Sequence, residues 1–286
     1  MIKKILLILI STLVFIFSMV CCTNSTIPEN EQETEDETET ETYGEEFVFE
    51  NKTYVQTFND DFSGTKLDTR KWEKCPEWER QDLGGYWEED CSYVKDGSLI
   101  VECKKNGSKL VSGAVRTKGK FEQAEGLYKF RFKAEKSSGL WYAIWLMCDD
   151  EKKVGNGAVD GAEIDMIEIL ANVQSKKEGE KQYINSAVHW DGYDSNHKSE
   201  GSKHFITDDF FNEWHECVFV WDSKGYKLYL DEKLIWDADG KDYGGTNTKP
   251  TYIKITAEFG TWGGPVDDSL LPAKMYVDYI SAYKLK

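Results

Sequence analysis

Several common patterns are absent from this sequence of 286 residues. It has no clear amphipathic-helix pattern and no internal repeat, which argues against a helical fold or a repeat array. It has no basic face, with 52 acidic residues against 35 basic ones, so a nucleic-acid partner is not expected. The five cysteines that follow residue 22 have no metal-ligand spacing.

The first 22 residues have the pattern of an export signal. A short basic start, Met1–Lys4, precedes an almost purely apolar run from residue 5 to residue 20, and then come Cys21 and Cys22. The paired cysteines predict a lipoprotein-type signal peptide over residues 1–22, with one cysteine lipidated. Plain secretion is one alternative. A retained transmembrane anchor is another, because the apolar run is only slightly short of a membrane span. We expect an exported protein that is a cell-surface or periplasmic lipoprotein, or is secreted, with membrane contact only through a lipid anchor.

Residues 23–46 alternate threonine and glutamate and contain almost nothing apolar. Such a segment cannot form a packed core, so we expect an acidic, disordered tether. A functional acidic tail is the alternative. Much of the formal net charge of −17 comes from this segment, and the rest of the chain is only mildly acidic.

Residues 47–286 contain short strand-like runs separated by Gly, Asn and Asp turns. Their length suits one large all-β domain, a β-jelly-roll sandwich of two antiparallel sheets, which we expect to be a monomer. Asp231 is expected at a hairpin turn. Cys75 and Cys91 are the pair most suited to a disulfide, and at least one other thiol should stay buried and free. The predicted strands cover residues 98–103, 127–133, 140–147, 184–190, 215–221, 226–230, 232–236, 252–258 and 275–283.

The run Glu163-Ile-Asp-Met-Ile-Glu168 places three carboxylates in an apolar, strand-like segment. Carboxylates are costly among apolar neighbours, which suggests a use for them. Because strand side chains alternate, Glu163 and Asp165 share a face and Glu168 would point the other way. A β-bulge near Met166-Ile167 would restore the parity and bury Ile164 on the opposite face. The carboxyls of the two glutamates could then approach to roughly 5–6 Å across a Cα separation of roughly 13 Å.

Two carboxyls at that separation suit a retaining glycosidase, which needs a nucleophile and an acid/base about 5–5.5 Å apart. One glutamate must be ionised and the other protonated. Asp165 between them could share a proton and keep the two pKa values apart. The alternative is a set of edge-strand or salt-bridging carboxylates without a catalytic role.

The residues resemble those of glycoside hydrolase family 16, in its laminarinase-like branch with the bulged E-x-D-x-x-E signature of endo-β-1,3(4)-glucanases. The likeness covers most of residues 54–286 and follows the family's order of motifs. The matching segments are Phe58–Gly64 with Leu67, Asp68 and Trp72, then Asp96–Leu99, Gly113–Lys118, Gly139–Met147, Val188–Trp190 and Val277–Ile280.

The resemblance implies a concave cleft that cuts β-glycans internally with retention. By position it assigns Glu163 as nucleophile, Asp165 as helper and Glu168 as acid/base. Aromatic rings suit the apolar faces of sugars, although tryptophan is also a good core residue. Arg116 could equally be a salt-bridging strand residue, and His189 a structural histidine. The substrate-binding candidates are Arg116, Trp141, Trp145, His189, Trp190 and Trp262.

No cofactor is required for this chemistry. The family often carries a structural Ca²⁺, for which Asp61 and Asp278 could supply oxygens. The segments Trp78–Trp87 and Ala257–Gly264 depart from the usual pattern, and because both would border the cleft they leave the substrate open. We expect a β-1,3- or mixed β-1,3/1,4-glucan. An algal galactan ranks lower because few basic residues lie near the motifs. A glycan transglycosylase and a non-catalytic surface glycan-binding protein are further alternatives.

Overall fold

The computed structural model describes residues 44–80, 84–171 and 182–286. The predicted signal (residues 1–22) and nearly all of the predicted tether (residues 23–46) lie outside these residues. The described part is all-β, with short 3₁₀ turns and no α-helix. It therefore contains no helix long and apolar enough to cross a membrane. The first strand begins at Glu46, one residue before the expected start of the domain.

The larger of two sheets has twelve strands among the described residues. All its ladders are antiparallel except the parallel pair β5–β8. Three strands lie off its main path: β1 pairs with β2, β2 pairs with β19, and β6 pairs with β7. Its main path is β17 (Lys233–Asp239), β16 (Gly225–Leu230), β15 (His215–Asp222), β10 (Gly126–Ala134), β19 (Ala273–Leu285), β7 (Ser98–Asn106), β8 (Lys109–Ser112), β5 (Gly85–Trp87) and β4 (Glu79–Arg80), with β1 (Glu46–Phe49), β2 (Lys52–Asp60) and β6 (Ser92–Lys95) attached.

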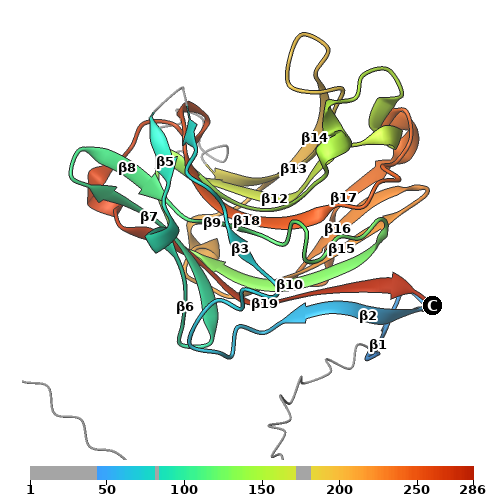
Figure 1. Cartoon of the computed structure of the whole chain (residues 1–286), viewed down its shortest axis with the longest axis horizontal. Helices are drawn as coiled ribbons and strands as arrows, with labels where there is room; N and C mark the ends of the chain where they lie inside the picture. Colours follow the sequence, from blue (N-terminus) through green and yellow to red (C-terminus); the bar gives the residue numbers. More distant parts are fainter. Residues whose placement is uncertain (1–43, 81–83, 172–181) are drawn as a thin grey trace, which may run out of the picture. The chain divides into compact units, whose positions relative to one another are not determined.

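The second sheet has seven strands in the same part of the chain and stacks over the first (Figure 1). Its order is β14 (Lys198–Phe205), β13 (Gln182–Trp190), β12 (Glu163–Ala171), β11 (Leu140–Met147), β18 (Tyr252–Phe259), β9 (Ala114–Arg116) and β3 (Glu73–Lys74). The 3₁₀ turns are η1 (Glu89–Cys91), η2 (Asp149–Lys152), η3 (Gly157–Asp160), η4 (Asp208–Phe210), η5 (Gly240–Tyr243), η6 (Thr261–Gly263) and η7 (Asp268–Leu270).

All nine predicted strands are present, and the predicted sandwich of two sheets is confirmed. The predicted hairpin at Asp231 is also confirmed. Asp231 and Glu232 both have positive φ, and Leu230 pairs with Lys233 across them. Two consecutive residues of positive φ form the type of turn whose twist matches that of the paired strands.

The sequence-based disulfide is wrong. Cys75 and Cys91 are both buried free thiols, as are Cys103, Cys148 and Cys217. Burial raises the pKa of the Cys75 and Cys91 thiols to about 11. These side chains therefore pack as small apolar groups, which is a common role for buried cysteine. The expectation of a buried free thiol is confirmed by the other three.

Alternation along the central strands decides what faces the interior. On β11, Leu140, Tyr142, Ile144 and Leu146 belong to the main core, and the intervening residues form a separate cluster on the outer face. Strand β18 repeats the pattern, with Ile253 and Ile255 in the core between the sheets and Lys254 on the outer face. This outer face is where the functional residues gather.

The bulge on β12 has its own hydrogen bond, which gives a first prediction. The hydroxyl of Ser186 on β13 donates to the Met166 carbonyl at 2.8 Å, and both groups are buried. Ser186→Ala leaves that carbonyl without its hydroxyl partner, so the free energy of unfolding should fall by about 1–3 kcal/mol. Urea unfolding measures this. The matched control is Ser199→Ala on the exposed strand β14, which should change stability little. Equal effects of the two substitutions would contradict the role of this hydrogen bond.

Candidate active site

The three acidic residues of β12 share the outer face of the seven-stranded sheet. On the β11 ladder, Asp165 lies opposite Trp145, whereas Ile167 lies opposite Ile144, so Met166 is the extra residue of a β-bulge. The β13 ladder shifts at the same point, between Asp165 and Glu168. Met166 and Ile167 are both fully buried, as is Ile164. The predicted bulge and the predicted burial of Ile164 are therefore confirmed.

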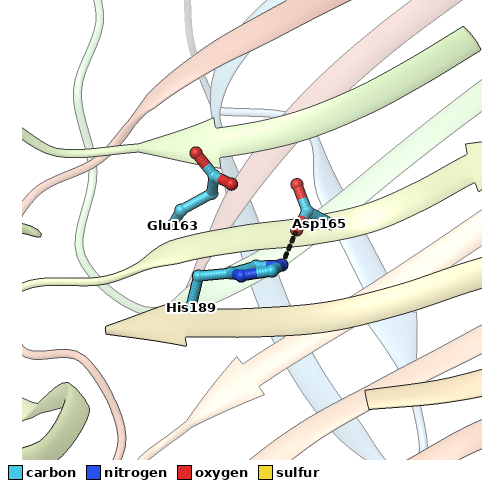
Figure 2. Close-up of side chains that lie close together, drawn as sticks. All are labelled: Glu163, Asp165 and His189. Carbon is cyan, nitrogen blue, oxygen red and sulfur yellow. Dashed lines mark ion pairs between the residues drawn. The ribbon is translucent and has the colours of Figure 1, made fainter. Parts of the chain in front are cut away.

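Figure 2 shows Glu163, Asp165 and His189 together at one end of this row. Glu163 lies opposite His189 in the β12–β13 ladder. His189 Nε2 is 3.2 Å from Asp165 Oδ2, an ion-pair distance. One ligand-type atom from each of the three residues lies within 4.8 Å of the others. Among the described residues this is the one group in which three such side chains converge.

Each glutamate has a different neutral partner. The Tyr193 hydroxyl donates a short hydrogen bond to Glu163 Oε2. The Asn185 amide donates to Glu168 Oε2 at 2.8 Å. His189 Nδ1 is 2.9 Å from Nε2 of His197, and the two rings are parallel. The two carboxylates are therefore held in separate environments on one face.

Burial raises the pKa of Glu168 well above its usual range, and the charge of Asp165 raises it further. Burial, and then Asp165, also raises the pKa of Glu163 to about 8, although His189 and the Tyr193 hydrogen bond oppose this rise. Burial by itself would lower the pKa of His189, but the adjacent Asp165 raises it to about 9. The imidazole is thus protonated at neutral pH and balances Asp165.

A cavity of about 520 Å³ lies over this row of carboxylates. Trp141 and Trp145, two of the substrate-binding candidates, both line it. Arg80 closes one wall, with its guanidinium over the Trp141 ring at 4.7 Å and bound to Glu258 Oε2 at 2.8 Å. Such a pocket of indole rings and fixed polar groups suits a sugar, whose C–H faces pack on aromatic rings.

The other predicted binding residues separate into three cases. Arg116 lines the cavity but is ion-paired with Glu73 at 2.9 Å, so it has the salt bridge that was its alternative role. Trp262 is 39% exposed and packs edge-on against Trp141 at 5.2 Å, beside the cavity rather than in its lining. His189 is not in the cavity lining and pairs with Asp165 at 3.2 Å.

The prediction that Trp190 lines the cleft is wrong. Trp190 is buried in the core between the sheets and packs against Tyr243 at 5.7 Å. The physical reason is strand alternation, because His189 and Trp190 are consecutive and must face opposite sides. The same parity argument, applied to Val188-His189-Trp190, identifies this error from the sequence.

The two expected calcium ligands both have protein partners. Asp278 accepts a hydrogen bond from Arg131 at 2.8 Å, and Asp61 accepts one from the backbone N–H of Ser63 at 3.1 Å. A cationic neighbour competes with a metal ion for a carboxylate. Neither residue belongs to a group of three converging ligand-type side chains among the described residues. Ca²⁺ also takes backbone carbonyl and water oxygens, so the structural Ca²⁺ stays a prediction.

Several lining residues escaped the sequence reasoning. On β18, Lys254, Thr256 and Glu258 are all buried on the cavity face. Their spacing of two within an apolar strand was a usable signal, the same one that identified β12. The segments Trp78–Trp87 and Ala257–Gly264 were expected to border the cleft, without individual side chains being named, and Trp78, Arg80, Trp87 and Glu258 confirm this by lining the cavity. Tyr193 carried no such signal, because it lies on a loop whose course depends on the rest of the fold.

Comparisons with known proteins agree with this geometry. Residues 79–281 match the family model described as glycosyl hydrolases family 16. Glucan endo-1,3-beta-glucosidase A1 of Niallia circulans is 27% identical over 263 residues, covering 79% of this chain and 37% of the relative. Endo-1,3-1,4-beta-glycanase EglC of Rhizobium meliloti is 26% identical over 201 residues, covering 67% of this chain and 37% of the relative. The chain thus spans little more than a third of the length of these relatives.

Among solved structures, the endo-beta-1,3-glucanase of Pyrococcus furiosus aligns with a TM-score of 0.68 at 24% identity. The alignment covers 84% of this chain and 98% of that one, which supports the same fold. The family model covers well over half of the chain and includes the whole bulged strand. The chain therefore belongs to glycosyl hydrolase family 16.

Proposed function

We propose that this protein is a retaining endo-hydrolase of β-1,3- or mixed β-1,3/1,4-glucan. The observation that carries the proposal is the placement of Glu163, Asp165 and Glu168 on one face of β12, beneath a tryptophan-lined cavity. The names of the two curated relatives support a β-1,3- or β-1,3-1,4-linked substrate. Membership of the family supports glycoside hydrolysis.

The neighbours of each glutamate support distinct roles. With a pKa of about 8, Glu163 is ionised in a minor fraction of the molecules at neutral pH. The phenol hydroxyl and the His189 cation beside it favour this form, which is the one that attacks the anomeric carbon. Burial and the charge of Asp165 favour the protonated form of Glu168 and outweigh the Asn185 amide, whose donated hydrogen bond favours the ionised form, so Glu168 can give its proton to the departing oxygen. After the first step the ionised Glu168 takes a proton from water, which then releases the sugar from Glu163.

Asp165 acts between the two glutamates as a fixed negative charge. His189, protonated at neutral pH, keeps it paired. The Asp165 charge raises the pKa of both glutamates. At Glu163 the His189 cation and the Tyr193 hydroxyl oppose the rise, whereas at Glu168 the opposing group is the neutral Asn185 amide. This asymmetry is the physical basis for separating nucleophile from acid.

Azide rescue tests the role of each glutamate. Glu163→Ala and Glu168→Ala should each lower kcat by on the order of 10²–10⁴-fold or more on an activated aryl β-glucoside oligosaccharide. Azide added to Glu163→Ala should attack from the vacated nucleophile side and give a glycosyl azide of inverted configuration. With Glu168→Ala it should attack the covalent intermediate and give the retained β-azide. Glu213→Ala, an exposed site, is the control. Exchanged azide configurations would reverse the two roles.

The raised pKa of Glu163 makes stability depend on pH. Its folded pKa of about 8 lies above the ordinary glutamate value of 4.5, so its contribution to stability is fully present below about pH 4.5 and is lost as pH rises through 8. Glu163→Gln removes that loss and can still accept the Tyr193 hydrogen bond. Its free energy of unfolding should therefore exceed that of the wild type by on the order of 1–3 kcal/mol near pH 7, and the two should converge near pH 4.

Urea unfolding across pH 4–8 measures this difference, with Glu213→Gln as the exposed control. A constant difference between Glu163→Gln and the wild type over that range would show that Glu163 has no raised pKa in the folded protein.

Substrate class is tested with laminarin, lichenan, agarose and pure β-1,3-, β-1,4- and mixed-linkage oligosaccharides. Cleavage of laminarin or lichenan into short oligosaccharides is expected, with products of retained configuration. Cleavage of agarose alone would support the galactan alternative. Longer products on addition of acceptor sugars would indicate transglycosylation. Binding without cleavage, unchanged in Glu163→Gln, would support a glycan-binding protein.

We also propose export as a lipid-anchored protein, which is supported by the apolar run ahead of Cys21 and Cys22. Metabolic labelling with a fatty-acid analogue should mark the wild type. Replacement of the acylated cysteine, Cys21 or Cys22, should abolish the label and release the protein from the membrane fraction. Secretion without any label would contradict the anchor.

A further inference from the structure

Three cations line the cavity above β12, and two of them have carboxylate partners. Arg80 binds Glu258, and Arg116 binds Glu73. Lys254 is the third, and it is 8% exposed. Among the described residues, the Lys254 ammonium makes no ion pair and no hydrogen bond.

Two tryptophan rings surround this ammonium. Lys254 Nζ is 3.9 Å from the centroid of the Trp145 ring and 4.8 Å from that of Trp87. Ring faces attract a cation, but they donate no electron pair in the way that an oxygen does. Three N–H donors therefore face the cavity without a protein acceptor among the described residues, an arrangement that burial of the side chain disfavours. Consistent with this, burial lowers the pKa of Lys254.

Strand register fixes where the ammonium lies in the cleft. Asp165 is opposite Trp145, Trp145 is opposite Lys254, and Lys254 is opposite Arg116 on four neighbouring strands. All four residues line the same cavity. Lys254 is thus on the floor of the glycan site, two strands from the catalytic row. A sugar adjoining the one under attack would lie over Trp145 and bring its substituents to this position.

Glu258 is on the same strand and face as Lys254, four residues further on. Its carboxylate already accepts hydrogen bonds from Nη2 and Nε of Arg80, at 2.8 and 3.2 Å, and from the Thr256 hydroxyl at 3.3 Å. Asp165 is likewise occupied by His189. The acidic groups of the cleft nearest to Lys254 in register are therefore engaged with other partners, and an acceptor for its ammonium has to come from the ligand.

We propose that Lys254 binds an anionic substituent, a sulfate ester or a carboxylate, on a sugar next to the point of cleavage. This inference rests on the proposed endo-hydrolase function and adds that the preferred glycan is a charged one. An anionic oxygen completes the coordination of the ammonium between the two indole rings. A neutral hydroxyl could accept one hydrogen bond there, but it would bring no negative charge into contact with the ammonium.

The test is a digestion of laminarin that carries about one sulfate ester for every few sugars at random ring positions, so that each position is sampled in one reaction. Mass spectrometry of the products gives the frequency of sulfate on the sugars beside the cut. For the wild type this frequency should exceed that of the starting polymer by at least threefold. In Lys254→Met, which keeps the length and apolar stem of the side chain, the enrichment should disappear. The same comparison on partly carboxylated laminarin distinguishes a sulfate from a carboxylate.

Lys241→Met is the matched control. Lys241 is a highly exposed lysine in η5, outside the cavity. Its replacement by methionine should leave the product pattern as in the wild type. Absence of enrichment in the wild type, or equal enrichment in Lys254→Met, would overturn the proposal. An equal loss of cleavage rate by Lys254→Met on neutral and sulfated polymer would also overturn it, because Lys254 would then act on Glu163 and not on the substituent of the substrate.

Failure of the proposed hydrolysis would be seen separately. If the wild type cleaves neither polymer, binding of sulfated and plain laminari-oligosaccharides by Glu163→Gln is measured by calorimetry, with and without Lys254→Met. A preference for the sulfated ligand of at least tenfold that is lost with Lys254→Met supports the anionic site even without catalysis. Equal affinities for the two ligands would contradict it.

Discussion

The single-residue bulge at Met166 is the constraint on which the site depends. A regular strand alternates its side chains, and that alternation separates core from cleft on β11, β13 and β18. On β12 the alternation is interrupted once, so that Met166 and Ile167 are both buried. Glu163 and Glu168 can then share a face although five positions separate them. The bulge thus keeps the apolar residues of β12 in the core and places its carboxylates together on the opposite face.

The bulge also needs support from the neighbouring strand. An extra residue leaves its backbone groups out of the regular ladder, and these must find other partners in a buried sheet. Ser186 supplies a hydroxyl to the Met166 carbonyl, and one position before it on β13 Asn185 donates to Glu168. The bulge and the acid it positions are therefore held by consecutive side chains of β13. The catalytic geometry is a property of two strands rather than of one motif.

The sequence was sufficient where a local pattern determines the structure. The strands of the core, the hairpin at Asp231 and the bulge each follow from residue type and spacing within one segment. Trp190 was misplaced because a resemblance was followed where strand parity disagreed with it. The Cys75–Cys91 pair was wrong because thiol pairing depends on three-dimensional approach, which spacing does not report. The resemblance indicated that the segment Trp78–Trp87 borders the cleft, but which of its side chains enter the cavity depends on tertiary contacts that no local pattern encodes.

Charge in the cleft is arranged so that most buried ions have a partner of their own. Asp165 pairs with His189, Glu258 with Arg80 and Arg116 with Glu73, while the raised pKa of Glu168 favours its protonated form. Burying an uncompensated charge is costly, so each of these pairings is a condition for placing so many acids under one cavity.

Lys254 is the exception, and its effect is local. The chain as a whole carries a formal net charge of −17, much of it in residues 23–46, and this charge repels an anionic polymer at a distance. Salt screens that repulsion beyond about 8–10 Å, whereas a contact between a desolvated ammonium and an anionic oxygen is screened far less. A net acidic protein can therefore favour a charged glycan at contact without attracting polyanions in general. The selectivity lies in one buried cation between Trp87 and Trp145, and not in the overall charge of the domain.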